Sequence, residues 1–150
     1  MKLYIDGDAL PNLLKPVLLR AIDRLSLETY VISNKRIAIG ESKNIKYVIV
    51  SAGADEADNR IVEMVEEGDL VITADIPLAD RVISKNSHAI NHRGGLYTVE
   101  NIKDYLSMRN LMQDIRDFGG PTRGPAPFSK KDVRDFTNQF NNFLTKQKLN

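Results

Sequence analysis

Residues 68–79 read Gly-Asp-Leu-Val-Ile-Thr-Ala-Asp-Ile-Pro-Leu-Ala, and this stretch decides the fold class. Its centre, residues 70–74, is a compact apolar run without alternation, which is typical of a strand buried on both faces. An aspartate and an Ile-Pro pair follow at once, as at the start of a helix. A buried strand that leads directly into a helix indicates an α/β fold.

The same pattern recurs through most of the chain. Further compact apolar runs lie at residues 3–6, 29–33 and 47–51, with a weaker one at 88–91. Between these runs, residues 12–25, 55–66 and 77–85 carry apolar side chains three and four apart, as amphipathic helices do. We therefore predict a single-domain, three-layer α/β fold with a mainly parallel central sheet and helices on both faces.

The C-terminal third predicts two more helices with a break between them. Residues 101–118 have a helical pattern, and residues 119–128 contain three of the nine glycines and three of the six prolines. Ser129 is placed to cap a final helix with the apolar stripe Val133, Phe136, Phe140, Phe143 and Leu144. We expect an α/β domain over 1–118, a Gly/Pro loop over 119–128, and an amphipathic helix over 129–150. That helix packs on its own domain or on a neighbour in a homo-oligomer.

Composition excludes several classes of protein. The chain has 150 residues, of which 42% are hydrophobic, enough for the core of one domain. It contains no cysteine, so disulfides, thiolate metal sites and a cysteine nucleophile are excluded. The first apolar run meets Asp6 before it reaches the length of a signal peptide or membrane span. We expect a cytoplasmic protein with no membrane partner.

Five aspartates follow predicted strands. Asp6 and Asp8 end the first run, Asp55 and Asp58 follow the third, and Asp75 follows the fourth. The carboxyl ends of parallel strands meet at one edge of a sheet, where ligand crevices form. Carboxylates gathered there repel unless some are protonated or a divalent cation neutralises them, and this donor set favours Mg²⁺ or Mn²⁺. Such a cation activates water for attack on a phosphodiester.

Each aspartate also has an ordinary structural explanation. Asp75 and Asp55 are each placed to cap a helix, and Asp8 is placed to open a turn before Pro11. Capping and metal binding explain any single aspartate equally well. The convergence of three strand ends favours a metal site for the set.

Four arginines are candidates for binding substrate phosphates. Arg109 and Arg116 fall within the apolar stripe of the helix predicted over 101–118, Arg93 stands beside a Gly-Gly pair, and Arg123 lies in the Gly/Pro loop. A guanidinium binds phosphate or carboxylate bidentately. The stems of Arg109 and Arg116 could equally pack on apolar surface while their charged groups reach solvent.

The two histidines and the remaining motifs are less informative. His88 and His92 stand four apart, but they flank a predicted strand and a Gly-Gly turn, which favours packing or surface roles over a helical metal pair. The chain has no P-loop, nucleophile-elbow or HExxH motif, so ATPase, serine-hydrolase and zincin functions lack support.

Five motifs, in order along essentially the whole chain, resemble the YaiI/YqxD family of bacterial proteins: residues 6–11, 53–59, 68–79, 91–98 and 119–127. That family is grouped with PIN-like domains, whose Mg²⁺- or Mn²⁺-dependent ribonucleases gather acids at the carboxyl edge of a parallel sheet. By position, Asp6 and Asp75 resemble the acids after the first and fourth PIN strands. Asp55 or Asp58 resembles the helix-borne acid between them.

The first motif departs from the family pattern. It usually reads Asp-Ala-Asp-Ala-Cys-Pro, and Asp8 is part of it, whereas Gly7 and Leu10 replace the first alanine and the cysteine here. This member therefore needs no cysteine as ligand or nucleophile.

The expected function is a metal-dependent nuclease acting on RNA, less readily on single-stranded or flapped DNA. Two alternatives stay open. Asp6 and Asp8 after a first strand also resemble the haloacid-dehalogenase-type phosphatases, which use an aspartyl nucleophile, although Ala9 and Leu10 do not fit that motif. A non-catalytic RNA-binding or protein-interaction module is the other alternative, because a fold can persist without its activity.

The net charge of +1 hides an uneven distribution. Residues 1–100 carry 12 basic and 15 acidic side chains, whereas residues 101–150 carry 9 and 5. This excludes a uniformly basic nucleic-acid binder. An acidic site in the sheet domain facing a basic C-terminal segment suits a metal-assisted phosphodiesterase.

Overall fold

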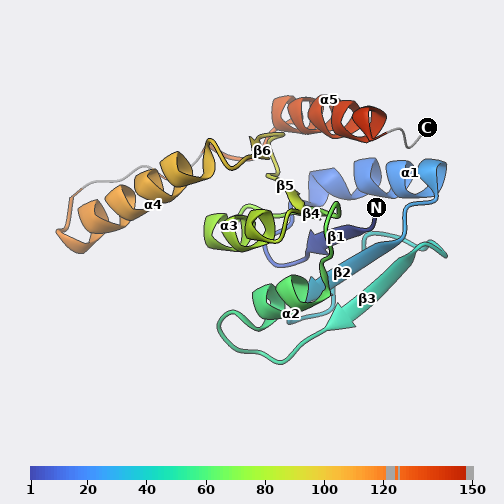
Figure 1. The fold of residues 1–150 in the computed structure, drawn as a ribbon, viewed down its shortest axis with the longest axis horizontal. Coiled ribbons are helices and arrows are strands. Elements are labelled where there is room, and N and C mark those ends of the chain that lie inside the picture. Colours follow the sequence, from blue (N-terminus) through green and yellow to red (C-terminus); the bar gives the residue numbers. More distant parts are fainter. Residues whose placement is uncertain (121–123, 125, 148–150) are drawn as a thin grey trace.

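The computed structural model describes residues 1–120, 124 and 126–147, and these form an α/β fold around a six-stranded sheet (Figure 1). The strands lie in the order β3-β2-β1-β4-β5-β6. Neighbours from β3 to β5 pair in parallel, and β6 is antiparallel to β5. The strands are β1 Leu3–Asp6, β2 Thr29–Ser33, β3 Ile45–Ile49, β4 Leu70–Ile72, β5 His88–Ile90 and β6 Leu96–Tyr97. The predicted three-layer architecture is confirmed.

The helices lie where the apolar spacing predicts them, within a few residues. They are the 3₁₀ turn η1 Asn12–Leu14, then α1 Lys15–Leu25, α2 Glu56–Met64, α3 Ile76–Ser84, α4 Ile102–Asp117 and α5 Lys130–Lys146. α5 begins after Ser129, whose backbone N–H and hydroxyl donate to the Asp132 carboxylate at 2.9 and 3.1 Å. This is the N-terminus that the sequence predicts.

Two strands differ from the prediction. The third strand starts at Ile45 rather than residue 47, because β3 is an edge strand and tolerates the exposed Lys46 that interrupts its apolar pattern. The sixth strand, β6, was not predicted. It has two residues, too few to produce a periodic signal, and it forms only because β5 offers a free edge.

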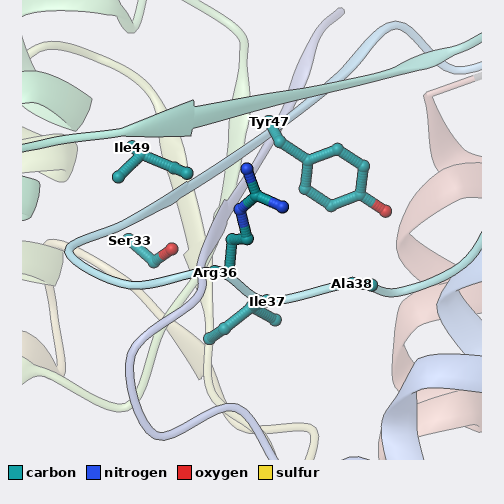
Figure 2. A pocket seen from close by; sticks show the side chains of 6 residues that line it. All are labelled: Ser33, Arg36, Ile37, Ala38, Tyr47 and Ile49. Atoms are coloured by element: carbon teal, nitrogen blue, oxygen red, sulfur yellow. The ribbon is translucent and has the colours of Figure 1, made fainter.

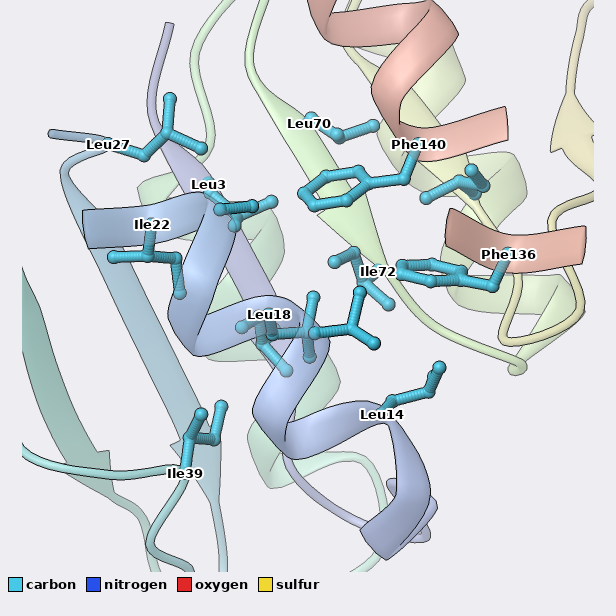
Figure 3. Close-up of a cluster of buried hydrophobic side chains, with 14 of the residues drawn as sticks. Leu3, Leu14, Leu18, Ile22, Leu27, Ile39, Leu70, Ile72, Phe136 and Phe140 are labelled. Carbon is cyan, nitrogen blue, oxygen red and sulfur yellow. The ribbon is translucent and has the colours of Figure 1, made fainter. Parts of the chain in front are cut away.

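Alternate side chains of the sheet build two cores. Leu3 and Ile5 of β1 belong to the core beneath α1 and α5, whereas Tyr4 belongs to the core beneath α2 and α3. Figure 3 shows Phe136 and Phe140 of α5 over the β4 strand, on the same side of the sheet as α1. The final helix is therefore part of this chain's own core.

Helix α4 lies differently from the other helices. In Figure 1 it extends away from the sheet, and Ile102 in its first turn is its one fully buried residue. Met108 and Leu111 in the middle of the helix are exposed, as is Phe118 directly after it. Of the predicted loop over 119–128, residues 121–123 and 125 lie outside the described residues. Within the described ranges, no helix combines the length and apolar character needed to cross a lipid bilayer.

We expect Phe140→Ala to lower the free energy of unfolding by about 3–5 kcal/mol, because it empties a fully buried site under α5. Phe118→Ala is the matched control: this ring is 90% exposed, so its loss should change stability by no more than about 0.5 kcal/mol. Urea unfolding followed by circular dichroism measures both. Similar values for the two variants would contradict the packing of α5.

Candidate metal centre

The five predicted aspartates line one pocket at the carboxyl edge of the sheet. The parallel register brings the ends of three strands together, with Asp6 beside Ile32 of β2 and Ile5 beside Ile72 of β4. The pocket has a volume of about 480 Å³, and its lining residues are Asp6, Asp8, Ala9, Asn34, Gly53, Ala54, Asp55, Asp58, Ala74 and Asp75. The strand ends and the N-terminus of α2 thus supply a set of oxygen donors to one place.

Asp6 is the most firmly held of the five. Its carboxylate is buried and accepts hydrogen bonds from the Thr73 hydroxyl at 2.8 Å and the Asp8 backbone N–H at 3.2 Å. Burial raises the pKa of Asp6 to about 7, and the negative charges of Asp58 and Asp8 add to this effect, against the two hydrogen bonds. Near neutral pH the pocket therefore contains a carboxyl that readily takes up a proton.

Thr73 connects the ends of β1 and β4. While its hydroxyl donates to Asp6, the same oxygen accepts the Asp75 backbone N–H at 3.0 Å. Sequence reasoning missed Thr73 as a site residue, although its position as the polar residue between the β4 apolar run and Asp75 is a usable signal. Asn34, in the loop after β2, was also missed, and no pattern marks it.

Asp58 lies on α2, and the charges of Asp75 and Asp55 act on its carboxylate. Burial raises its pKa to about 6, followed by the negative charges of Asp75 and Asp55. The positive charge of Arg81 on α3 lowers it, and that guanidinium also donates to Asn59 at 2.9 Å. Burial, with a smaller contribution from neighbouring like charges, raises the pKa of two aspartates in this pocket.

The capping explanation holds for one aspartate. Asp75 caps α3, since its carboxylate accepts the Leu78 backbone N–H at 2.9 Å. Asp55 stands before α2 with a left-handed φ of 67°, and its side chain caps no N–H of that helix. Asp8 accepts the Asn34 backbone N–H at 3.4 Å, so it contacts the loop after β2. Asp55 and Asp8 are thus not occupied by helix capping.

The carboxylate and amide oxygens that line the pocket are suitable ligands for a hard divalent cation, but their side chains do not converge on one point in this structure. Carboxylate and amide oxygens are the ligands that Mg²⁺ and Mn²⁺ prefer. Among the described residues, no three acidic or histidine side chains form a complete metal-binding group. Asp55 is exposed and Asp8 and Asp58 are half-buried, so these three can turn toward the fixed Asp6.

Of the four arginines predicted to bind phosphate, Arg93, Arg109 and Arg116 do not line this pocket. Arg93 forms an ion pair with Asp132 at 2.8 Å and donates to the Ala126 carbonyl at 2.6 Å, which ties the β5–β6 loop to the start of α5. Arg109 and Arg116 are exposed on α4, where Arg116 donates to Gln113 of its own helix. Arg123 lies outside the described residues.

Neither histidine is among the residues that line this pocket. His88 of β5 makes an edge contact with Phe143 of α5, at 5.0 Å between ring centroids. His92 is buried, and burial lowers its pKa to about 4. Both are packing residues.

We expect the ionisation of Asp6 to lower stability as pH rises, because its pKa goes from its ordinary 3.8 to about 7 on folding. This contribution of about 4 kcal/mol is fully present below about pH 4 and is lost by about pH 7. Asp58 acts in the same direction, whereas buried His92, with its pKa lowered to about 4, adds stability as pH rises. Asp6→Asn cannot ionise, so its free energy of unfolding should decline less with pH than that of wild type. Urea unfolding in EDTA across this pH range measures it, and equal slopes in both proteins would contradict it.

Sequence comparison agrees with the resemblance carried by the motifs. Residues 4–146 match the family model described as "Uncharacterized BCR, YaiI/YqxD family". The UPF0178 proteins of Sulfurimonas denitrificans and Sulfurovum sp. are 67% and 64% identical over 97% of this chain, covering 97% and 99% of their own lengths. That of Janthinobacterium sp. is 47% identical over 99% of this chain and 98% of its own. No solved structure matches. The chain belongs to the YaiI/YqxD family.

Proposed function

We propose that this protein is a Mg²⁺- or Mn²⁺-dependent nuclease that hydrolyses phosphodiester bonds in RNA. The observation that carries the proposal is the convergence of five aspartates from three strand ends in one pocket. A cation bound there supplies an activated water and stabilises the negative charge that develops on the phosphate. The aspartates would hold that cation.

The side chains divide into fixed and adjustable donors. Asp6 is held by Thr73, and Asp75 is held by its cap to α3, so these two are in place before any ligand arrives. The side chains of Asp8, Asp55 and Asp58 make no helix cap and are at least partly exposed, so they would be free to close around a cation. Burial is the main cause of the raised pKa values of Asp6 and Asp58, and the smaller contribution from neighbouring carboxylates is the part that a bound cation would relieve.

Two further observations support RNA as the substrate. The basic excess of residues 101–150 provides a long-range attraction for a polyanion. The resemblance to PIN-like ribonucleases, at Asp6, Asp75 and the α2 aspartates, points to the same chemistry.

We expect the purified protein to cleave labelled RNA oligonucleotides in Mn²⁺, and Asp6→Asn or Asp75→Asn to lose at least about a hundredfold in rate. Asp75→Asn is informative because asparagine still caps α3. Asp114→Asn removes the same charge from the exposed face of α4 and should keep full activity. Gel electrophoresis of the products measures the rates.

Each other outcome selects a different function. Equal cleavage by wild type and both pocket variants would identify a contaminating nuclease and reject the proposal. Hydrolysis of a small phosphomonoester without cleavage of RNA would indicate a phosphatase. RNA binding without cleavage, unchanged in Asp75→Asn, would indicate a non-catalytic module.

We expect Mn²⁺ to raise the melting temperature by several degrees, because a ligand at 100 times its Kd adds about 2.7 kcal/mol to the free energy of unfolding. Asp58→Asn should abolish the shift while leaving the metal-free protein folded. Asp114→Asn should shift like wild type. Differential scanning fluorimetry measures the melting temperatures. A wild-type melting temperature that does not change when Mn²⁺ or Mg²⁺ is added would rule out the metal site.

A further inference from the structure

A second pocket lies between β3 and the loop that follows β2 (Figure 2). Its volume is about 450 Å³, and it is lined by Ser33, Arg36, Ile37, Ala38, Tyr47 and Ile49. This volume is in the range of small-molecule sites. Tyr47 and Ile49 stand two apart on β3 and so share a face of the strand, and they are 41% and 56% exposed. An aromatic ring and aliphatic groups therefore form an open apolar surface here.

This apolar pocket adjoins the acidic pocket. Ser33 lines the first and Asn34, the next residue, lines the second. The ends of β1 and β2 are in close contact: the Gly7 N–H donates to the Ile32 carbonyl at 2.8 Å, and a Cβ on Gly7 would lie 2.9 Å from that of Ser33. A single ligand can therefore reach both pockets along the carboxyl edge of the sheet.

The ring of Tyr47 is held in place. Its hydroxyl donates to the Gly40 carbonyl at 2.8 Å and accepts the backbone N–H groups of Ile39 at 3.1 Å and Gly40 at 3.3 Å. An anchored ring loses little conformational entropy when a ligand stacks on it. These three bonds make Tyr47 a preorganised stacking surface.

Arg36 adds a positive charge to the apolar pocket. Figure 2 shows its guanidinium between Ile49 and the ring of Tyr47. In the part of the chain that the structure describes, no carboxylate forms an ion pair with it. A purely apolar occupant would leave this charge without a partner, and a simple anion would leave the aromatic surface unused.

We propose that this pocket binds an unpaired nucleobase next to the phosphate held at the acidic pocket, with the base stacked on Tyr47 and Arg36 contacting the adjoining phosphate or the base. A nucleotide supplies both the planar ring and the anion that the lining requires. A base in a duplex is stacked and paired and cannot enter. The substrate class is therefore single-stranded RNA, an inference that rests on the proposed nuclease function.

The test measures the Kd of a hydrolysis-resistant phosphorothioate RNA, single-stranded and fluorescently labelled, by anisotropy in Mn²⁺. Tyr47→Ala should raise the Kd about tenfold, since stacking of one base on an aromatic ring has about this effect. Tyr47→Phe keeps the ring and should bind more tightly than Tyr47→Ala. Lys46→Ala, which removes a positive charge from the other face of the same strand, should leave the Kd unchanged.

Two competitors test the chemistry of the occupant. An abasic ribose-phosphate oligomer should bind more weakly than RNA, and equally to wild type and Tyr47→Ala. Duplex RNA of the same sequence should compete poorly. Competition by duplex as strong as by single strand would overturn the proposal, and melting curves check that every variant is folded.

The outcomes separate this proposal from the nuclease. Tyr47-dependent binding without cleavage of natural RNA would support the base pocket and reject the catalytic function. Mn²⁺-dependent cleavage with equal Kd for wild type and Tyr47→Ala would do the reverse. RNA that neither binds nor is cleaved would overturn both.

Discussion

The parallel pairing of β1 with β2 on one side and β4 on the other is the constraint on which the rest of the structure depends. The chain leaves β1, builds β2 and β3 on one side, and then crosses to β4 on the other, so β1 lies at the point where the order of the sheet reverses. Ligand crevices form at such points. Asp6, Asp75 and the N-terminus of α2 meet there, and Thr73 joins two of the three elements by hydrogen bonds.

Burying Asp6 beside other carboxylates costs electrostatic free energy, which the packing of the domain must offset. Asp6 is buried among other carboxylates, and its raised pKa is the measure of that cost. The apolar layers on both faces of the sheet, including Phe136 and Phe140 of α5, offset it. The C-terminal helix thus contributes to the stability of a site that it does not touch.

The carboxyl edge of the sheet carries two neighbouring pockets of opposite character. The acidic pocket at β1 and β4 suits a cation and a phosphate, and the apolar pocket at β2 and β3 suits a planar ring. Helix α4 extends away from both pockets, with Met108 and Leu111 exposed in its middle and Phe118 exposed directly after it. The basic residues of α4 therefore act at a distance from this edge, whereas Arg36 and Arg81 lie close to it.

The sequence by itself determined the α/β class, the order of strands and helices apart from β6, and the five aspartates that line the acidic pocket. Burial on both faces of a sheet and helical spacing leave a local pattern that makes this possible. The sequence also contains the five motifs that identify the YaiI/YqxD family. Tertiary structure alone decided that Asp75 caps a helix while Asp55 does not, and that Arg93 pairs with Asp132. It also decided that Asn34 lines the pocket and that buried Thr73 donates to Asp6. Tertiary structure also decided that α4 extends away from the sheet and that Tyr47 lies beside Arg36. These depend on which distant segments come together, and spacing along the chain contains no information about contacts made across strands.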